Sequence, residues 1–238
     1  MLGISFLLTR FLPLSLYIEI KRYMEKEAIA KAWDWEKESK KEPWLTPEPI
    51  AYYLVSRWKG QGKKDYLDFG CGLGRHALFF KENGFAVKAF DLSSDAVIAT
   101  KKLGVDATIG DMHHLEYGKQ TFDCLFANHV VSHTDRKGID MVLSEIYRVL
   151  RHGGEAYMDL CRKEEDFPSE GSSLLDPWTV IDTKPGPEQG IPHSHADKAD
   201  IDILFKDFEI LTLERIDSIK ENGNATGYSH WYLLIRKA

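Results

Sequence analysis

The residues Asp68-Phe-Gly-Cys-Gly-Leu-Gly74 constrain the fold of this 238-residue chain more than any other stretch. A short apolar run leads into three glycines spaced G-x-G-x-G, and residues 75–80 continue as the start of a helix. Such a strand, glycine turn and helix let backbone N–H groups approach a ligand closely. A dinucleotide fingerprint needs a glycine where this chain has Arg75, which disfavours a pyrophosphate site and a nicotinamide oxidoreductase. The Asp68 carboxylate instead suits a cationic amino group.

Four later segments follow the glycine turn in a recognisable order. Three of them predict short strands that end at polar residues, and the fourth predicts the end of a helix and a Gly-Gly turn before a fifth strand. The segments are residues 85–91, 107–112, 122–128 and 145–154. Together with the glycine turn they resemble the class I S-adenosylmethionine-dependent methyltransferases. The resemblance covers about residues 44–160, with a matching tail at 206–236.

The resemblance implies a role for each polar strand end. Asp68 would meet the amino group of the methionine moiety, and Asp91 would accept both hydrogen bonds of the ribose diol. Asp111 would accept from the exocyclic amine of adenine, while Met112 would pack against the ring. The cofactor-binding residues that the resemblance implies are Asp68, Gly70, Cys71, Gly72, Gly74, Asp91, Leu92, Asp111, Met112 and Asn128. The Gly-Cys-Gly-x-Gly-Arg turn is also similar to that of the tellurite-resistance type within this class.

The expected fold is α/β, with a doubly wound, mostly parallel seven-stranded sheet and helices on both faces. The resemblance implies the strand order 3-2-1-4-5-7-6 with the last strand antiparallel. We divide the chain into an N-terminal extension and helical cover at 1–43 and a methyltransferase domain at 44–238. A lid is expected at about 161–197, where Pro, Gly, Ser and acidic residues make a long connection.

Composition limits the possible partners. The net charge is −6, with 31 basic and 37 acidic residues and no long basic block, so a small-molecule substrate is expected rather than nucleic acid. The three cysteines show no C-x-x-C spacing, which indicates neither a zinc site nor a disulfide framework. Reduced thiols favour the cytoplasm.

The first residues are apolar but interrupted by Arg10. A membrane-spanning helix needs about 20 apolar residues in a row, and a secretory signal needs an early positive charge and a cleavage site. We therefore expect residues 1–23 to be an extension that the fold does not need, and membrane association is not expected. From Met24 to Lys41 the charged residues and alanines predict an exposed helix.

Two histidines that follow the predicted fourth strand are the candidate catalytic bases. His129 and His133 stand four positions apart, and His133 lies where related methyltransferases often carry a histidine. On a helix this spacing would align the two rings for a metal ion, but no carboxylate stands near them at ligand spacing, so no metal is expected. In the lid, Trp178, His193 and His195 are the expected substrate contacts.

The sequence thus predicts an enzyme that transfers a methyl group from S-adenosylmethionine to a small molecule by in-line displacement. The acceptor atom, whether O, N, S or C, stays open, as does the need for a base. The alternative is a module that binds the cofactor without turnover. A group of aromatic residues ahead of the glycine turn would either pack as part of a helical cover or cap the cofactor's sulfonium. These residues are Trp33, Trp35, Trp44, Tyr52 and Tyr53.

Overall fold

The computed structural model describes residues 28–35, 44–163, 167, 172–183, 185–219 and 225–238. The helices of this part are α2 (Pro49–Gly60), α3 (Arg75–Glu82), α4 (Ser94–Lys102), α5 (Arg136–Val149) and α6 (Lys198–Leu204). The strands are β1 (Asp65–Phe69), β2 (Ala86–Asp91), β3 (Asp106–Ile109), β4 (Phe122–Ala127), β5 (Leu150–Arg162), β6 (Ser172–Asp176), β7 (Thr179–Asp182), β8 (Pro192–Ala196), β9 (Phe208–Ile219) and β10 (Ala225–Lys237).

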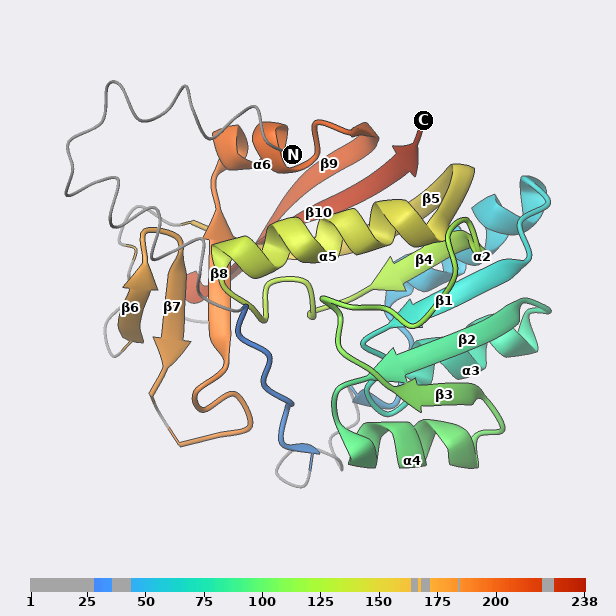
Figure 1. The fold of residues 1–238 in the computed structure, drawn as a ribbon, viewed down its shortest axis with the longest axis horizontal. Coiled ribbons are helices and arrows are strands. Elements are labelled where there is room, and N and C mark those ends of the chain that lie inside the picture. The colour runs from blue at the N-terminus through green and yellow to red at the C-terminus, as the bar shows by residue number, and fades with distance from the viewer. Residues whose placement is uncertain (1–27, 36–43, 164–166, 168–171, 184, 220–224) are drawn as a thin grey trace, which may run out of the picture.

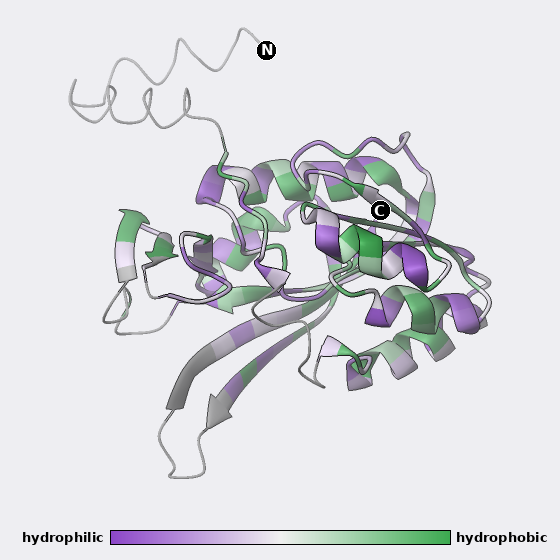
Figure 2. Ribbon diagram, turned by 90° about the horizontal axis from the view of Figure 1, so that it is seen from below, coloured by the Kyte–Doolittle hydropathy of each residue, from purple (hydrophilic) through white to green (hydrophobic). Residues whose placement is uncertain are grey.

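The central sheet has the order β3-β2-β1-β4-β5-β10-β9. Strands β1 to β5 are parallel, and β10 runs antiparallel to both β5 and β9. This arrangement confirms the predicted order 3-2-1-4-5-7-6, with β9 and β10 as the sixth and seventh strands. Figure 2 shows the β9–β10 pair extending past the body of the domain.

Three further strands in the lid were not predicted. β8 pairs in parallel with the last residues of β5, and β7 and β6 continue antiparallel from it, to the left in Figure 1. The composition of this region predicted a long connection without strands, because prolines, serines and acidic residues hide the alternation. In β8 that alternation exists, since its five residues are buried and half-buried in turn.

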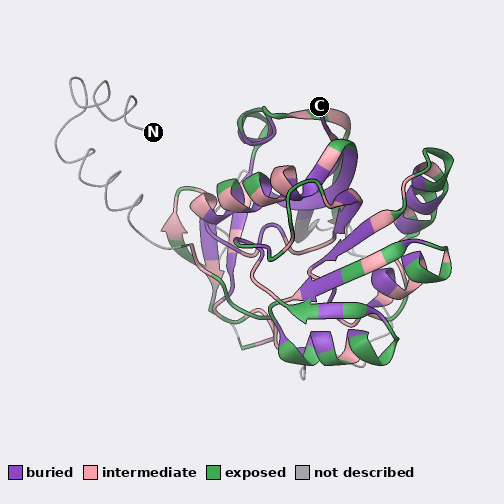
Figure 3. Cartoon of the chain, turned by 45° about the vertical axis from the view of Figure 1, so that its right-hand side comes forward, coloured by how far each residue is buried: buried purple, intermediate pink, exposed green. Residues whose placement is uncertain are grey.

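Helices cover both faces of the sheet, as predicted. On one face α2 and α3 pack aromatic residues against β1, with the rings of Tyr66 and Phe80 stacked at a centroid distance of 4.0 Å. On the other face α5 buries its apolar stripe against the sheet. That stripe contains Ile139, Val142, Leu143, Ile146 and Val149. Figure 3 shows the resulting contrast between buried central strands and the exposed outer surfaces of the helices.

Residues 28–35 form an extended segment, which we call the strap. The predicted exposed helix is wrong here, because the backbone of the strap bonds to other segments instead of to itself. Asp34 N–H donates to the Pro187 carbonyl at 3.3 Å, and the Thr134 hydroxyl donates to the Ile29 carbonyl at 3.1 Å. The rest of that predicted helix, and the expected extension at 1–23, lie outside the described residues. Among the described residues, every helix is too short or too polar to span a lipid bilayer.

A buried carboxylate joins α2 to the sheet. Glu155 of β5 has a side chain that is 1% exposed, and it accepts hydrogen bonds from Arg57 Nε at 2.8 Å and Arg57 Nη2 at 2.9 Å. The Trp58 indole donates to it at 3.0 Å, and Arg236 of β10 donates at 3.1 Å. Burial alone would raise the pKa of Glu155, but the hydrogen bonds from Arg57, Arg236 and Trp58 outweigh it and lower the pKa to about 2.

Glu155→Ala is therefore expected to lower the free energy of unfolding by about 3 kcal/mol at pH 7, because it leaves several buried donors unpaired. The folded-state pKa lies below the unfolded one, so the loss is greatest above about pH 5 and shrinks as pH falls toward 3. Chemical denaturation across this pH range measures it. Glu209→Ala is the matched control, because Glu209 pairs with the same Arg236 but is 54% exposed, and it should cost less than about 0.5 kcal/mol. Equal costs for the two variants would contradict the role given to Glu155.

Candidate active site

The glycine turn lies between β1 and α3, at the carboxyl end of the sheet. The backbone φ angles of Gly70, Gly72 and Gly74 are 69°, 51° and 84°. Residues that carry a Cβ rarely adopt such positive angles. A Cβ at Gly70 would lie 2.5 Å from Val130 Cγ2. The sequence therefore needs glycine here both for the backbone conformation and for close packing.

Asp68 lies beneath this turn and is 2% exposed. Its Oδ1 accepts from the Tyr66 hydroxyl at 3.2 Å, whereas its Oδ2 is buried without a partner. Burial raises the pKa of Asp68 to about 7, against the opposing hydrogen bond from Tyr66. The side-chain nitrogen of Asn128, at the end of β4, is also buried without a partner. An unpaired buried polar atom is costly, so both groups fit a ligand that would complete them.

Asp91 ends β2 beside the turn. Its Oδ2 accepts from Gly72 N–H at 2.8 Å, and its Oδ1 accepts from Ser93 N–H at 2.9 Å. Burial raises its pKa, against these backbone hydrogen bonds. Each carboxylate oxygen can accept a second hydrogen bond, so the pair keeps capacity for a diol. The next residue, Leu92, is 36% exposed.

The turn after β3 is tied to the loop that follows β4. Asp111 Oδ1 accepts from His113 N–H at 2.9 Å and lies 2.6 Å from His113 Nδ1. His113 Nε2 lies 2.8 Å from the Thr134 hydroxyl, and the residue is only 3% exposed, so His113 links the two loops from a buried position. Met112 is 9% exposed and packs in the main core.

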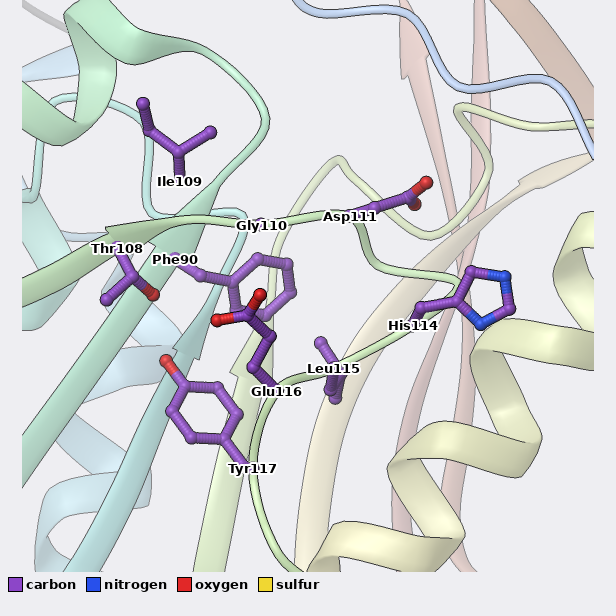
Figure 4. Close-up of a pocket in the computed structure, with 9 residues that line it drawn as sticks. All are labelled: Phe90, Thr108, Ile109, Gly110, Asp111, His114, Leu115, Glu116 and Tyr117. Carbon is purple, nitrogen blue, oxygen red and sulfur yellow. The ribbon is translucent and has the colours of Figure 1, made fainter.

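A shallow pocket opens beside this turn (Figure 4). The enclosed space has room for about one water molecule, far less than a complete ligand site needs, so the described residues form only a shallow recess here. The lining residues are Phe90, Thr108, Ile109, Gly110, Asp111, His114, Leu115, Glu116 and Tyr117.

His129 belongs to a buried network centred on Asp159 of β5. Asp159 Oδ1 accepts from His129 N–H at 2.6 Å, and Oδ2 lies 3.0 Å from His129 Nδ1 and 2.6 Å from His230 Nδ1. The Cys161 thiol lies 3.5 Å from His230 Nε2. Burial would raise the pKa of Asp159, but the charges and hydrogen bonds of the two histidines hold it well below its usual range. Burial would lower the pKa of His230, but Cys161 and Asp159 raise it to about 10.

His133 lies in a second group. Its ring packs at 4.8 Å from the His193 ring and stacks on Trp33 at 5.8 Å. Burial and the neighbouring His193 hold the pKa of His133 well below its usual value. His193 Nε2 lies 3.8 Å from Glu188 Oε1. The turn that carries both His129 and His133 is not helical, so the two rings enter different groups.

From the sequence we expected no metal site, because no carboxylate stands near His129 and His133 along the chain. In the folded structure, carboxylates do lie near both histidines. Folding brings Asp159 to His129 and Glu188 to His133, with a second histidine in each group. The ligand atoms within each group lie within 4.8 Å of one another.

The two remaining lid candidates are placed differently. The Trp178 ring lies under the Arg136 guanidinium at 5.1 Å, and its indole N–H donates to Asp200 at 3.2 Å, so it holds the lid to α5 and α6. His195 lies two residues beyond His193 on β8, and burial lowers its pKa to about 4. Substrate contact by either residue stays a prediction.

The aromatic group ahead of the glycine turn divides into two parts. Trp33, Trp35 and Trp44 contact one another at centroid distances of 5.6 to 6.0 Å, and the Trp35 ring lies directly over the glycine turn. Tyr52 and Tyr53 lie on the outer face of α2 and are 56% and 51% exposed. Only the tryptophans are therefore placed to cover a ligand at the turn.

Sequence reasoning missed Asp159, His230 and Glu188. An acidic residue within the otherwise apolar run of β5 was a visible signal for Asp159. His230 reaches the site only because β10 is antiparallel to β5, with His230 opposite Cys161. Nothing local distinguishes Glu188 from the other acidic residues of the lid.

Comparison with known proteins supports the class that this geometry defines. Residues 67–158 match the family described as "Methyltransferase domain". The malonyl-[acyl-carrier protein] O-methyltransferase of Hamiltonella defensa is 30% identical over 134 residues, 55% of this chain and 51% of that protein. The enzyme of the same name from Salmonella typhimurium is 26% identical over 179 residues, 74% of this chain and 68% of that protein. The chain thus spans about half the length of the first relative.

Solved structures show the same fold. A SAM-dependent methyltransferase of Methanosarcina mazei has a TM-score of 0.61 at 20% identity, covering 81% of this chain and 99% of that one. The 1,6-didemethyltoxoflavin-N1-methyltransferase of Burkholderia thailandensis, solved with S-adenosylhomocysteine, has a TM-score of 0.60 at 15% identity over 96% of this chain and 92% of that one. The family match and the fold identify residues 67–158 as a methyltransferase domain, built on the sheet that the S-adenosylmethionine-dependent neighbours share. The predicted class and cofactor are thereby confirmed.

The contact between Trp35 of the strap and Gly72 of the glycine turn should make this turn intolerant of a side chain. Gly72→Ala would place a Cβ 2.7 Å from Trp35 Cζ2, so it should cost about 1–3 kcal/mol beyond the backbone strain and change the tryptophan emission. Gly62→Ala is the control, because Gly62 has φ +73° but open space around it, and it should cost only the roughly 1–2 kcal/mol of left-handed strain. Thermal unfolding and fluorescence compare the two. Equal costs with unchanged emission would show that Trp35 does not lie on the turn.

Proposed function

We propose that the protein transfers the methyl group of S-adenosylmethionine to a small-molecule acceptor held between the sheet and the lid. The observation that carries the proposal is the buried, unpaired Oδ2 of Asp68 under the glycine turn. A carboxylate in this position calls for a cationic partner, which the amino group of the cofactor's methionine moiety supplies. A phosphate-bearing cofactor would instead place negative charge beside Asp68.

The chain's own residues would bind and orient the cofactor. Asp68 and the glycine turn would hold the methionine end, and Asp91 would accept from the ribose diol. Asp111 and Met112 would meet the adenine beside the pocket of Figure 4, and Asn128 would donate its unpaired N–H to the ligand. The bound cofactor supplies a sulfonium-activated methyl group, so the protein mainly aligns the acceptor for in-line attack.

His129 is the proposed general base. Its Nδ1 lies 3.0 Å from Asp159 Oδ2, and this contact orients the ring. The imidazole would take the proton that the acceptor loses. The side chain of His129 is 24% exposed, more than those of its partners Asp159 and His230, as a group that meets a substrate requires.

This base bears on the nature of the acceptor. A hydroxyl, amine or thiol must lose a proton during methylation, whereas a carboxylate is already ionised and needs no base. The contact between Asp159 and a candidate base, His129, thus favours an acceptor that loses a proton. The named relatives favour a second candidate, a malonyl group carried by an acyl-carrier protein.

A turnover assay tests these alternatives together. The protein is incubated with methyl-labelled S-adenosylmethionine and a panel of small phenols, amines, thiols and carboxylic acids, with malonyl acyl-carrier protein as a separate arm. Label in a small acceptor supports the proposal, and label only in the carrier arm moves the acceptor to the second candidate. Cofactor binding without transfer in any arm favours a module that binds without turnover.

The binding of S-adenosylhomocysteine is expected to depend on pH through Asp68. The raised pKa of about 7 means that the carboxylate is protonated at low pH, so affinity should fall on the order of 20-fold from pH 7.5 to 5.5. Calorimetric titration measures this slope. Asp68→Asn should bind weakly and with little pH dependence, whereas the control Asp106→Asn, at a side chain 58% exposed, should keep the wild-type slope. A wild-type affinity that does not change with pH would refute the assignment of Asp68.

His129→Asn should lower turnover by roughly 10²- to 10⁴-fold, the usual contribution of a positioned base. Asparagine tolerates the φ of 54° at this position, so the backbone is preserved. S-adenosylhomocysteine affinity should stay within about twofold of wild type. His152→Asn is the matched control, because His152 is exposed near the start of β5, at the end of the strand opposite to Asp159. Full turnover in His129→Asn would show that the acceptor needs no base.

A further inference from the structure

Three side chains that meet where the lid contacts the core have the composition of a transition-metal site. His133 follows β4, whereas Glu188 and His193 belong to the lid, one before β8 and one within it. The group consists of two imidazoles and one carboxylate. Their ligand atoms lie within 4.8 Å of one another. We propose that His133, Glu188 and His193 bind one divalent transition-metal ion.

The spacing of these atoms suits an ion. Zinc binds nitrogen and oxygen at about 2.0–2.2 Å, so ligand atoms at neighbouring corners of a tetrahedron lie roughly 3.3–3.5 Å apart. His193 Nε2 and Glu188 Oε1 are 3.8 Å apart, beyond a direct hydrogen bond but within about half an ångström of the coordinated separation. Small side-chain rotations would complete the site.

The surroundings of the group also fit a metal site. Trp33 stacks on the His133 ring, and the His133 and His193 rings pack against each other with their centroids 4.8 Å apart. These ring contacts fix the orientation of both imidazoles. The Glu188 side chain is 39% exposed, so an ion can enter from solvent.

The neighbouring group of His129, Asp159 and His230 is a poorer candidate. There the histidine nitrogens lie 3.0 and 2.6 Å from one oxygen of Asp159, as direct hydrogen bonds require. An ion would have to push these atoms apart within a buried network. The geometry around Asp159 therefore suits hydrogen bonding, whereas the geometry of His133, Glu188 and His193 suits coordination of an ion.

The ligand set also indicates the class of ion. Imidazole ligands select zinc, nickel, cobalt, copper or iron over magnesium and calcium. Three protein ligands leave at least one position open, which an oxygen or nitrogen atom of an acceptor could occupy. Because two ligands come from the lid and one from the core, a bound ion would also join these two parts. The inference does not depend on methyl transfer.

Calorimetric titration of Zn²⁺ into tag-free, chelator-stripped protein tests the proposal. We expect one ion per chain, with affinity reduced at least about 100-fold in His193→Ala and at least about 10-fold in Glu188→Gln. Zn²⁺ should also slow proteolytic cleavage of the lid in the wild type but not in Glu188→Gln. Both lid variants leave the sheet intact, and circular dichroism verifies their folding.

Two controls locate the ion. His152→Ala changes an exposed histidine on β5 and should bind Zn²⁺ as the wild type does. His230→Gln changes the Asp159 network, which shares no ligand with the proposed site, and should also retain binding. No stoichiometric binding to the wild type, or binding that is lost in His230→Gln but kept in His193→Ala, would overturn the proposal. Methyltransferase activity enters none of these measurements, so its absence leaves the result unaffected.

Discussion

The antiparallel pairing of β10 with β5 is the constraint on which the rest of the structure depends. This register sets Arg236 opposite Glu155 at one end and His230 opposite Cys161 at the other. The first pair belongs to the charged contact that fixes α2. The second brings a histidine to the carboxyl end of the sheet, beside the polar groups that β1 to β5 supply. A parallel last strand would have placed His230 at the opposite end.

The central sheet and the cofactor end of the site could be predicted because their signals are local. The glycine turn needs residues without a Cβ, and Asp68 and Asp91 each stand at a strand end, so their neighbours in space follow from the winding of the sheet. Such information is contained in a few consecutive residues. The structure then adds what the sequence did not contain, namely that one oxygen of Asp68 is buried without a partner.

The acceptor side could not be predicted in the same way, because its groups come from distant segments. Asp159 and His230 are joined by strand register, and Glu188 meets His133 only when the lid folds back on the core. Helix propensity also gave the wrong prediction for the strap. Its alanines and charged residues favour a helix, but contacts with the lid and with the loop after β4 hold the backbone extended. Tertiary contacts outweighed local preference in each case.

The strap and the lid are bonded to each other as well as to the core. Asp34 donates to the Pro187 carbonyl, the Lys31 side chain donates to the Gln189 carbonyl, and Trp35 lies over Gly72. A ligand that leaves the glycine turn would have to pass a segment that is itself bonded to the lid, so we expect the strap and the lid to open together. Release of S-adenosylhomocysteine would then follow a single rate. That rate would be set by the breaking of the contacts between the strap and the lid rather than by the affinity of the glycine turn.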